Sequence, residues 1–161
     1  MSQITIKLAD FVANNNQNDT LVAYGIGSSL AVILYDEGVR AGGIVHFMFP
    51  SPATGSLKTR DYPAMYADSG IPQLVKSCVE LGAGKDALTA RLAGGAFMLG
   101  KGISQSISDG NISAARAILS EMGIKVTAED TGGNHMRTVR LDIATGNIYL
   151  KRPDGKWEEF R

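Results

Sequence analysis

Residues 24–50 read Tyr-Gly-Ile-Gly-Ser-Ser-Leu-Ala-Val-Ile-Leu-Tyr-Asp-Glu-Gly-Val-Arg-Ala-Gly-Gly-Ile-Val-His-Phe-Met-Phe-Pro, and this stretch decides the fold. Gly25 and Gly27 can take backbone conformations that are closed to other residues, so they predict a sharp turn. The apolar, β-branched run 30–35 predicts a buried strand. The next four residues are typical of a hairpin turn, and 41–49 is the returning strand. The sequence therefore predicts a hairpin directly after a glycine turn.

The register of this hairpin brings two reactive side chains together. A four-residue turn pairs Tyr35 with Arg40. The same register puts Ser29 opposite His46. Side chains directly opposite in an antiparallel pair have Cβ atoms about 5 Å apart, close enough for a nucleophile and its general base. A slip of one residue would send them to opposite faces of the sheet.

Two further segments have the apolar spacing of amphipathic helices. The first covers 66–81, where Pro72 should begin or kink the helix. The second covers 112–122, with Asn111 in position to be its N-cap and Gly123 in position to end it.

The remaining segments predict short strands and loops. Strands are expected over 4–8, 21–24, 88–99, 126–128, 139–143 and 148–151. Gly94 and Gly95 should mark a bulge or a close backbone approach. Glu129 and Asp130 are expected in a glycine turn, which favours a structural role for both. Loops are expected over 14–19, 50–63 and 100–110.

The length of 161 residues suits one domain spanning 1–161. Most of the expected strands join through hairpins, with two helices between them. That order predicts an α/β protein with largely antiparallel or mixed sheet and both helices packed to one side.

Composition excludes several classes of function. The formal net charge is zero, so we expect no nucleic-acid partner and no membrane-surface partner. We find no signal peptide and no apolar run long enough to span a bilayer, so we expect a cytoplasmic protein without membrane insertion. A single cysteine excludes an internal disulfide, and two histidines with one cysteine argue against a zinc site.

Two glycine-rich stretches match nucleotide-binding motifs only in part. Gly25 and Gly27 begin a dinucleotide fingerprint, but a strand pattern follows where a helix is required. Residues 95–102 resemble a P-loop, but Gly102 stands where Ser or Thr is required. Cys78 lies on the apolar stripe of a helix and is interpreted as a core residue. We therefore expect no cofactor and no metal.

Several sequence motifs, which follow one another in the family's order, resemble those of the CheD family, the chemoreceptor glutamine deamidases of bacterial and archaeal chemotaxis. Besides residues 24–50, the resemblance includes Tyr66-Ala67-Asp68 with Ile71-Pro72, Gly94-Gly95-Ala96, Asp109-Gly110-Asn111-Ile112 and Ala128-Glu129-Asp130-Thr131-Gly132-Gly133. It covers nearly the whole chain. The resemblance implies a layered α/β/β sandwich, similar to the catalytic domain of cytotoxic necrotizing factor toxins.

The resemblance also implies an activity and partners. Family members hydrolyse the side-chain amide of receptor glutamines to glutamate and ammonia, and some cleave receptor methyl esters. They resemble cysteine hydrolases, in which a thiolate attacks and histidine shuttles protons. The implied partners are a methyl-accepting chemoreceptor and the CheC-type phosphatase, which mimics the receptor, so we expect a monomer that forms a heterodimer.

Two of the three active-site positions implied by the resemblance are altered here. Ser29 occupies the position of the family's cysteine nucleophile, and His46 is the family histidine. Ala23 stands where the family commonly has threonine, six positions before the nucleophile. Gly27 and Ser28 are assigned to substrate binding. Since serine needs a better-oriented base than a thiol does, we expect this form to be inactive or very slow.

Three hypotheses follow in order. The chain is a receptor deamidase with an altered nucleophile position, a non-catalytic adaptor for receptor or CheC, or a serine amidase or esterase using Ser29 and His46. A serine introduced to silence the enzyme or trap a complex and a natural non-catalytic member both stay open. Asp68 is interpreted as a loop anchor, and His135 as a surface loop residue.

Overall fold

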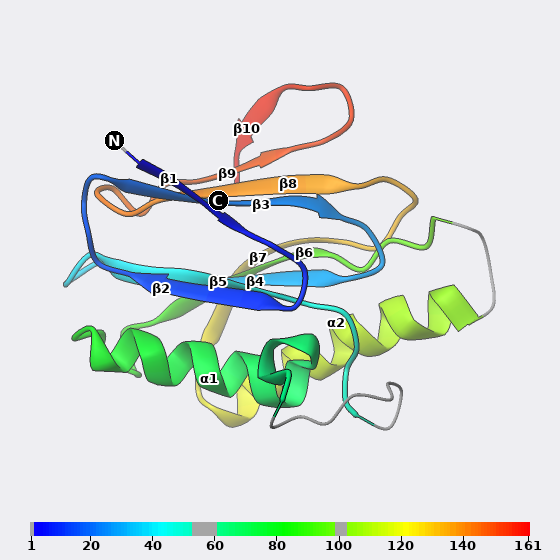
Figure 1. Ribbon diagram of the computed structural model, residues 1–161, viewed down its shortest axis with the longest axis horizontal. Helices are drawn as coiled ribbons and strands as arrows, with labels where there is room; N and C mark the ends of the chain where they lie inside the picture. The colour runs from blue at the N-terminus through cyan, green and yellow to red at the C-terminus, as the bar shows by residue number, and fades with distance from the viewer. Residues whose placement is uncertain (1, 53–60, 99–102) are drawn as a thin grey trace.

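Two five-stranded sheets pack face to face, and two helices cover the outer side of one of them (Figure 1). This computed structural model describes residues 2–52, 61–98 and 103–161. The layers run sheet, sheet, helices from top to bottom of the view. The predicted α/β/β arrangement, with both helices on one side, is confirmed.

The elements follow one another along the chain as β1 (Ser2–Ile6), β2 (Asp10–Asn14), β3 (Asp19–Ile26), β4 (Leu30–Asp36), β5 (Ala41–Phe47), the 3-10 helix η1 (Pro63–Met65), α1 (Ala67–Glu80), β6 (Thr89–Gly94), α2 (Ile103–Glu121), β7 (Lys125–Thr131), β8 (Arg137–Asp142), β9 (Ile148–Lys151) and β10 (Trp157–Glu159).

Each sheet mixes parallel and antiparallel pairs. The upper sheet has the order β1-β3-β8-β9-β10, and the lower sheet has the order β2-β5-β4-β6-β7. The pairs β1/β3 and β6/β7 are parallel, while the others are antiparallel. The prediction of mixed sheets is therefore confirmed.

Strand β4 is buried on both faces, which explains its unbroken apolar run. Leu30, Val32 and Leu34 face the helices, and the alternating residues Ala31 and Ile33 face the other sheet. The lower sheet thus contributes to two cores, one against each neighbouring layer.

The register of the β4–β5 hairpin differs from the predicted one by two residues. Tyr35 pairs with Gly42 rather than with Arg40, and Ala31 pairs with His46. Arg40 belongs to the turn, where its φ of 53° lies in the left-handed region. An offset of two leaves every side chain on its expected face, because the side-chain period of a strand is two.

Several predicted boundaries were wrong because tertiary contacts override local propensity. Strand β2 was not predicted, although it completes one edge of the lower sheet. The helical part of 100–110 was taken for a loop, and the strand prediction over 88–99 narrows to β6 alone. Glu129 and Asp130 lie in strand β7, not in a glycine turn. Residues 53–60 of the loop predicted over 50–63 lie outside the described residues. So do residue 99, at the end of the predicted strand segment, and residues 100–102, at the start of the loop predicted over 100–110.

Helix α1 forms where its apolar stripe predicts it. Pro72 lies inside the helix and does not begin it, and Gly82 follows with a left-handed φ of 104°. Cys78 is fully buried on the stripe, and burial raises the pKa of its thiol to about 12. Among the described residues, no helix is both long and apolar enough to cross a membrane.

Candidate functional site

The candidate nucleophile lies where the chain passes from one sheet to the other. Strand β3 belongs to the upper sheet and β4 to the lower sheet, so residues 27–29 cross between them. Gly25 has a φ of 63° and lies inside β3, at the bulge where the pairing with β8 shifts register between Ala23 and Ile26. The φ of Gly27 is not in the left-handed region, and a Cβ there would meet Met98 at an ordinary 3.7 Å. Of the two glycines, only the first adopts a left-handed φ, and it does so at the strand bulge that precedes the crossing.

Ser29 and His46 form the predicted contact. The Ser29 Oγ lies 2.7 Å from the His46 Nε2. The two residues are 5% and 2% exposed. Because His46 pairs directly with Ala31, Ser29 is its diagonal neighbour rather than its opposite. The contact is thus made across the sheet diagonal, on the face that looks toward the other sheet.

Burial keeps the imidazole neutral. Desolvation lowers the pKa of His46 from 6.5 to about 4. In the tautomer that carries its proton on Nδ1, the Ser29 hydroxyl donates to Nε2. The Nδ1 atom is buried and has no hydrogen-bond partner among the described residues. The pair therefore has a nucleophile and a base, but no third group holds the ring among those residues.

Ala23 faces the same layer as the His46 ring. It is fully buried on β3, between Ile6 of β1 and Val139 of β8. It belongs to the core between the sheets, which also contains Ala31, the residue paired with His46. A methyl group offers no hydrogen bond to the unpartnered Nδ1.

The end of strand β6 holds the nucleophile turn from one side. Gly95 N–H donates to the Ser29 carbonyl at 2.8 Å, and Ala96 N–H donates to the Gly27 carbonyl at 2.8 Å. Gly94 has a φ of 122°, and a Cβ there would lie 2.5 Å from the Ser29 carbonyl oxygen. The predicted close backbone approach at this glycine pair is confirmed.

Asn111 holds the same turn from the helix layer. Its Nδ2 donates to the Ser28 carbonyl at 3.0 Å and to the Met48 carbonyl at 2.9 Å. One acceptor adjoins Ser29, and the other lies two residues beyond His46. Sequence reasoning took Asn111 for an N-cap, but it lies inside α2 and is fully buried. The signal that could have identified it was a polar residue on an apolar helical stripe.

The residues assigned to substrate binding, Gly27 and Ser28, are partly exposed at this turn. Among the described residues, the backbone N–H groups of Ser28 and Ser29 have no hydrogen-bond acceptor. Free donors next to a nucleophile are one requirement of an oxyanion hole.

The acidic motif residues form structural ion pairs. Glu129 pairs with Arg116 of α2, and the Asp130 Oδ1 lies 2.9 Å from the Arg137 guanidinium. Asp130 also pairs with Arg152. Asp68 lies in the first turn of α1, and burial raises the pKa of its carboxyl group. None of these three ion pairs involves Ser29 or His46.

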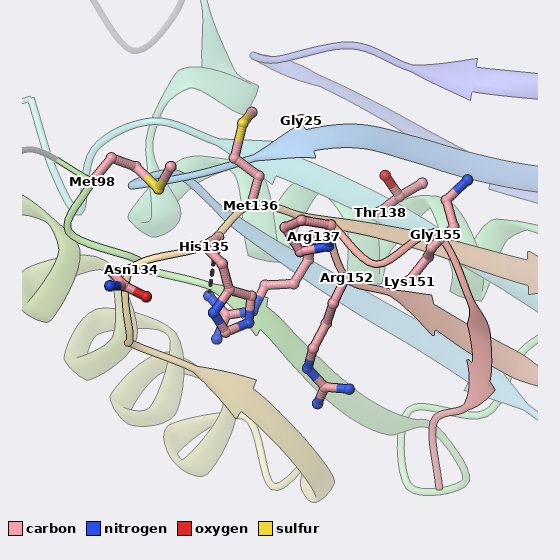
Figure 2. A pocket seen from close by; sticks show the side chains of 11 residues that line it. Gly25, Met98, Asn134, His135, Met136, Arg137, Thr138, Lys151, Arg152 and Gly155 are labelled. Carbon is pink, nitrogen blue, oxygen red and sulfur yellow. Dashed lines mark hydrogen bonds between the residues drawn. The ribbon is translucent and has the colours of Figure 1, made fainter.

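A pocket of about 580 Å³ lies at the end of the upper sheet, on the side of the nucleophile turn (Figure 2). We call it the β8–β9 pocket. Its lining consists of Gly25, Met98, Asn134, His135, Met136, Arg137, Thr138, Lys151, Arg152, Pro153 and Gly155. His135, expected in a surface loop, is partly exposed and lines this pocket just before strand β8.

The chain matches a known family along most of its length. A family model described as "CheD chemotactic sensory transduction" matches residues 48–152. A Syntrophus aciditrophicus (strain SB) protein named "Probable chemoreceptor glutamine deamidase CheD 1" is 39% identical over 160 residues, which cover 99% of this chain and 100% of that protein. A "Probable chemoreceptor glutamine deamidase CheD" of Solibacter usitatus (strain Ellin6076) is 36% identical over 160 residues, covering 99% and 94%. A protein of the same name from Methanococcus vannielii is 41% identical over 129 residues, covering 79% and 81%.

The family model and the full-length relatives agree with the family that the sequence motifs indicate. The chain therefore belongs to the CheD family.

Proposed function

We propose that this chain is a cytoplasmic chemoreceptor glutamine deamidase in which Ser29 occupies the nucleophile position and His46 is the general base. The observation that carries the proposal is the 2.7 Å contact between the Ser29 Oγ and the His46 Nε2 at a buried site. The names of the relatives, chemoreceptor glutamine deamidases, support the substrate class.

With cysteine at position 29, the reaction consumes only water and glutamine. The thiol gives its proton to the His46 Nε2, and the thiolate attacks the side-chain amide carbon. The N–H groups of Ser28 and position 29 stabilise the oxyanion. His46 then gives its proton to the nitrogen, the C–N bond breaks and ammonia leaves. Water, deprotonated by His46, hydrolyses the thioester to glutamate and the free thiol.

With serine at this position, we expect the same chemistry to be very slow. A hydroxyl holds its proton more tightly than a thiol, and a base whose conjugate acid has a pKa of about 4 removes it poorly. The buried Nδ1 has no acceptor among the described residues to support an imidazolium, and Ala23 stands at the position where the resemblance to the family implies threonine. Catalytic groups act as a unit, so these losses cost orders of magnitude.

Restoring the thiol tests the proposal. We expect Ser29→Cys to release ammonia from a chemoreceptor fragment at least about 100-fold faster than the Ser29 chain. Ser28→Cys is the matched control, because it places the same thiol one position before the nucleophile position, where it does not face the base. His46→Ala in the Ser29→Cys background should remove the gain. The proposal would be excluded if the Ser29 chain and the three variants all released ammonia at the same background rate.

A second candidate is a non-catalytic adaptor that binds a chemoreceptor or a CheC-type phosphatase. The unpartnered His46 Nδ1 and the methyl group of Ala23 favour it, because both weaken catalysis and neither affects the outer surface. This candidate predicts a heterodimer with the phosphatase for the Ser29 chain and for Ser29→Cys, measured by analytical ultracentrifugation, with no ammonia release by either. Labelling of Ser29 by a fluorophosphonate would instead identify a serine hydrolase.

A further inference from the structure

The β8–β9 pocket carries positive charge without a lining carboxylate. Arg137, Lys151 and Arg152 are among its lining residues, and none of the eleven is Asp or Glu. Figure 2 shows the two methionines at one end, Thr138 and Lys151 at the other, and the two arginines between them. The pocket therefore offers an apolar end and a cationic end to one ligand.

The two arginines are largely occupied by the protein itself. Arg137 is 2% exposed and donates to Asp130 and to the carbonyls of Gly94 and His135. Arg152 pairs with both Asp130 and Glu158. Three cations thus face two carboxylates, which leaves one positive charge.

Lys151 carries that remaining charge. Its ammonium lies 4.9 Å from the centroid of the Trp157 ring. No carboxylate pairs with it among the residues that the structure describes. An ammonium held beside an aromatic ring has three donors to offer to an incoming acceptor.

The apolar end of the pocket adjoins the nucleophile turn. Met98 and Met136 are each 43% exposed. A Cβ built on Gly25 would lie 3.4 Å from the Met136 Cε, and one on Gly27 would lie 3.7 Å from the Met98 Cγ. Exposed methionines suit binding surfaces, because their flexible side chains fit varied apolar partners.

The strand register places the cationic end relative to the turn. Ile26 pairs with Arg137 on β8, and Thr138 pairs with Lys151 on β9. Lys151 therefore lies two strand spacings, roughly 10 Å, from the end of β3. That separation corresponds to about two turns of a bound helix or three residues of an extended segment.

We infer that the β8–β9 pocket binds an acidic side chain of the receptor segment that carries the target glutamine, while Met98 and Met136 contact that segment's apolar side. Lys151 pairs with the carboxylate and sets which glutamines are recognised. This inference rests on the proposed function, and it names a specificity determinant outside the Ser29–His46 pair.

Binding by the Ser29 chain tests the inference without turnover. The probes are two fluorescein-labelled peptides with one glutamine each; one has glutamates within two helical turns of it, and the other has serines there. By fluorescence anisotropy we expect the acidic peptide to bind about fivefold tighter at low salt, with the preference lost at high salt. Lys151→Glu should abolish the preference.

Two controls match the variants in chemistry. Lys76→Glu makes the same charge change on the exposed side of α1 and should keep the preference. Met136→Ala should weaken the binding of both peptides. Val79 is an exposed apolar residue on α1, and Val79→Ala should weaken the binding of neither peptide. Equal binding of both peptides, or equal effects of Lys151→Glu and Lys76→Glu, would overturn the inference.

Turnover separates this inference from the proposed function. An active Ser29→Cys chain whose KM is the same for both peptides, and unchanged by Lys151→Glu, overturns the pocket assignment and leaves the activity standing. An inactive Ser29→Cys chain whose binding preference still depends on Lys151 overturns the activity and leaves the acidic subsite standing.

Discussion

At the scale of single residues, burial governs the Ser29–His46 pair. Both side chains are almost completely covered, and the ring is neutral because desolvation lowers the pKa of His46 to about 4. A neutral imidazole accepts a proton, but one with so low a pKa gives it up readily. The residue at position 29 therefore decides whether the pair performs chemistry, because a thiolate beside the ring stabilises its charged form.

The titration of His46 can be measured directly. We expect its ring to stay neutral down to about pH 5 in the Ser29 chain. Between pH 6.5 and 4 the unfolded chain binds a proton that the folded chain refuses, so stability falls as pH falls through this window, by roughly 3 kcal/mol in full. NMR of the ring protons in a His135→Gln variant, which leaves one histidine, measures the pKa.

The Ser29→Cys variant provides the comparison for that titration. A thiolate within contact distance should raise the pKa of His46 toward its ordinary value, so the pH window over which acid lowers stability should become narrower. A His46 ring that titrates near 6.5 in the Ser29 chain would contradict the burial argument.

The sequence predicted this pair correctly but for a reason that needs refinement. The alternation of side chains along each strand determines which face of the sheet a side chain occupies. A register shift of two residues leaves that face unchanged. The register shifts by two residues because the four-residue turn covers 37–40, with Asp36 paired to Ala41, instead of beginning at Asp36. The unpartnered Nδ1 could not be predicted, because it depends on which atoms of two sheets meet.

At the scale of elements, helix α2 positions the site from below the sheet. Asn111 binds the carbonyl before Ser29 and a carbonyl beyond His46, so it ties the nucleophile turn to the end of β5. Ser108, one turn earlier, donates to the Ala96 carbonyl at 2.6 Å. The helix thus supports both backbone segments that flank the nucleophile.

Loss of the Asn111 amide should affect turnover more than binding. In the Ser29→Cys background we expect Asn111→Ala to lower kcat by about 10- to 100-fold with little change in KM, because the Ser28 and Met48 carbonyls lose their shared donor and the pair loses its alignment. Steady-state ammonia release measures both constants. Ser113→Ala, on the exposed side of the same helix, should change neither.

Asn111→Asp separates alignment from packing. It keeps the side-chain shape but replaces the donor by a carboxylate that repels both carbonyls, so it should lose as much kcat as Asn111→Ala. Activity near that of the parent in Asn111→Asp would show that the amide acts by filling space.

Elements with strong periodicity were predictable, and those made by tertiary contact were not. The apolar stripe of α1 and the alternation of apolar and polar residues in β8 and β9 can be recognised directly in the sequence. The first half of α2 is rich in Gly and Ser, and its Gly110 packs closely against Pro50, where a Cβ would lie 3.3 Å from the ring. Such a close contact favours glycine at this position, although glycine has a low intrinsic propensity for helices.

At the scale of the whole molecule, one ion-pair network connects the two sheets. Asp130 is on β7 of the lower sheet, whereas Arg137 begins β8 of the upper sheet and Arg152 follows β9. Across the same interface, the Tyr35 hydroxyl of β4 donates to the Ile143 carbonyl at 2.7 Å. Polar contacts thus fix how the sheets face each other, in addition to the apolar core.

Adjacent carboxylates on β7 give a matched test of this network. Asp130→Ala should cost about 3–5 kcal/mol in the free energy of unfolding, because it leaves the buried Arg137 guanidinium without its counter-ion. Glu129→Ala removes a solvent-exposed pair with Arg116 and should cost less than about 1 kcal/mol. Urea unfolding measures both, and equal costs would contradict a structural role for the buried pair.

The layered class could be predicted from the sequence, but the sheet assignment could not. Hairpin spacing and two helical stripes indicate a mixed α/β protein, and the family motifs indicate the α/β/β order. Strand patterns do not reveal that β3 and β4, joined by three residues, belong to different sheets. That crossing is also what puts Ser29 at the boundary between the layers.

The depth of the Ser29 hydroxyl has a consequence for the length of any amide that can reach it. A group that is 5% exposed cannot come out to meet its target, so the target has to be threaded inward from the surface. Glutamine holds its amide one methylene farther from its own main chain than asparagine does. We therefore expect an asparagine at the position of the target glutamine to react more slowly, because its amide reaches one methylene less far toward Ser29.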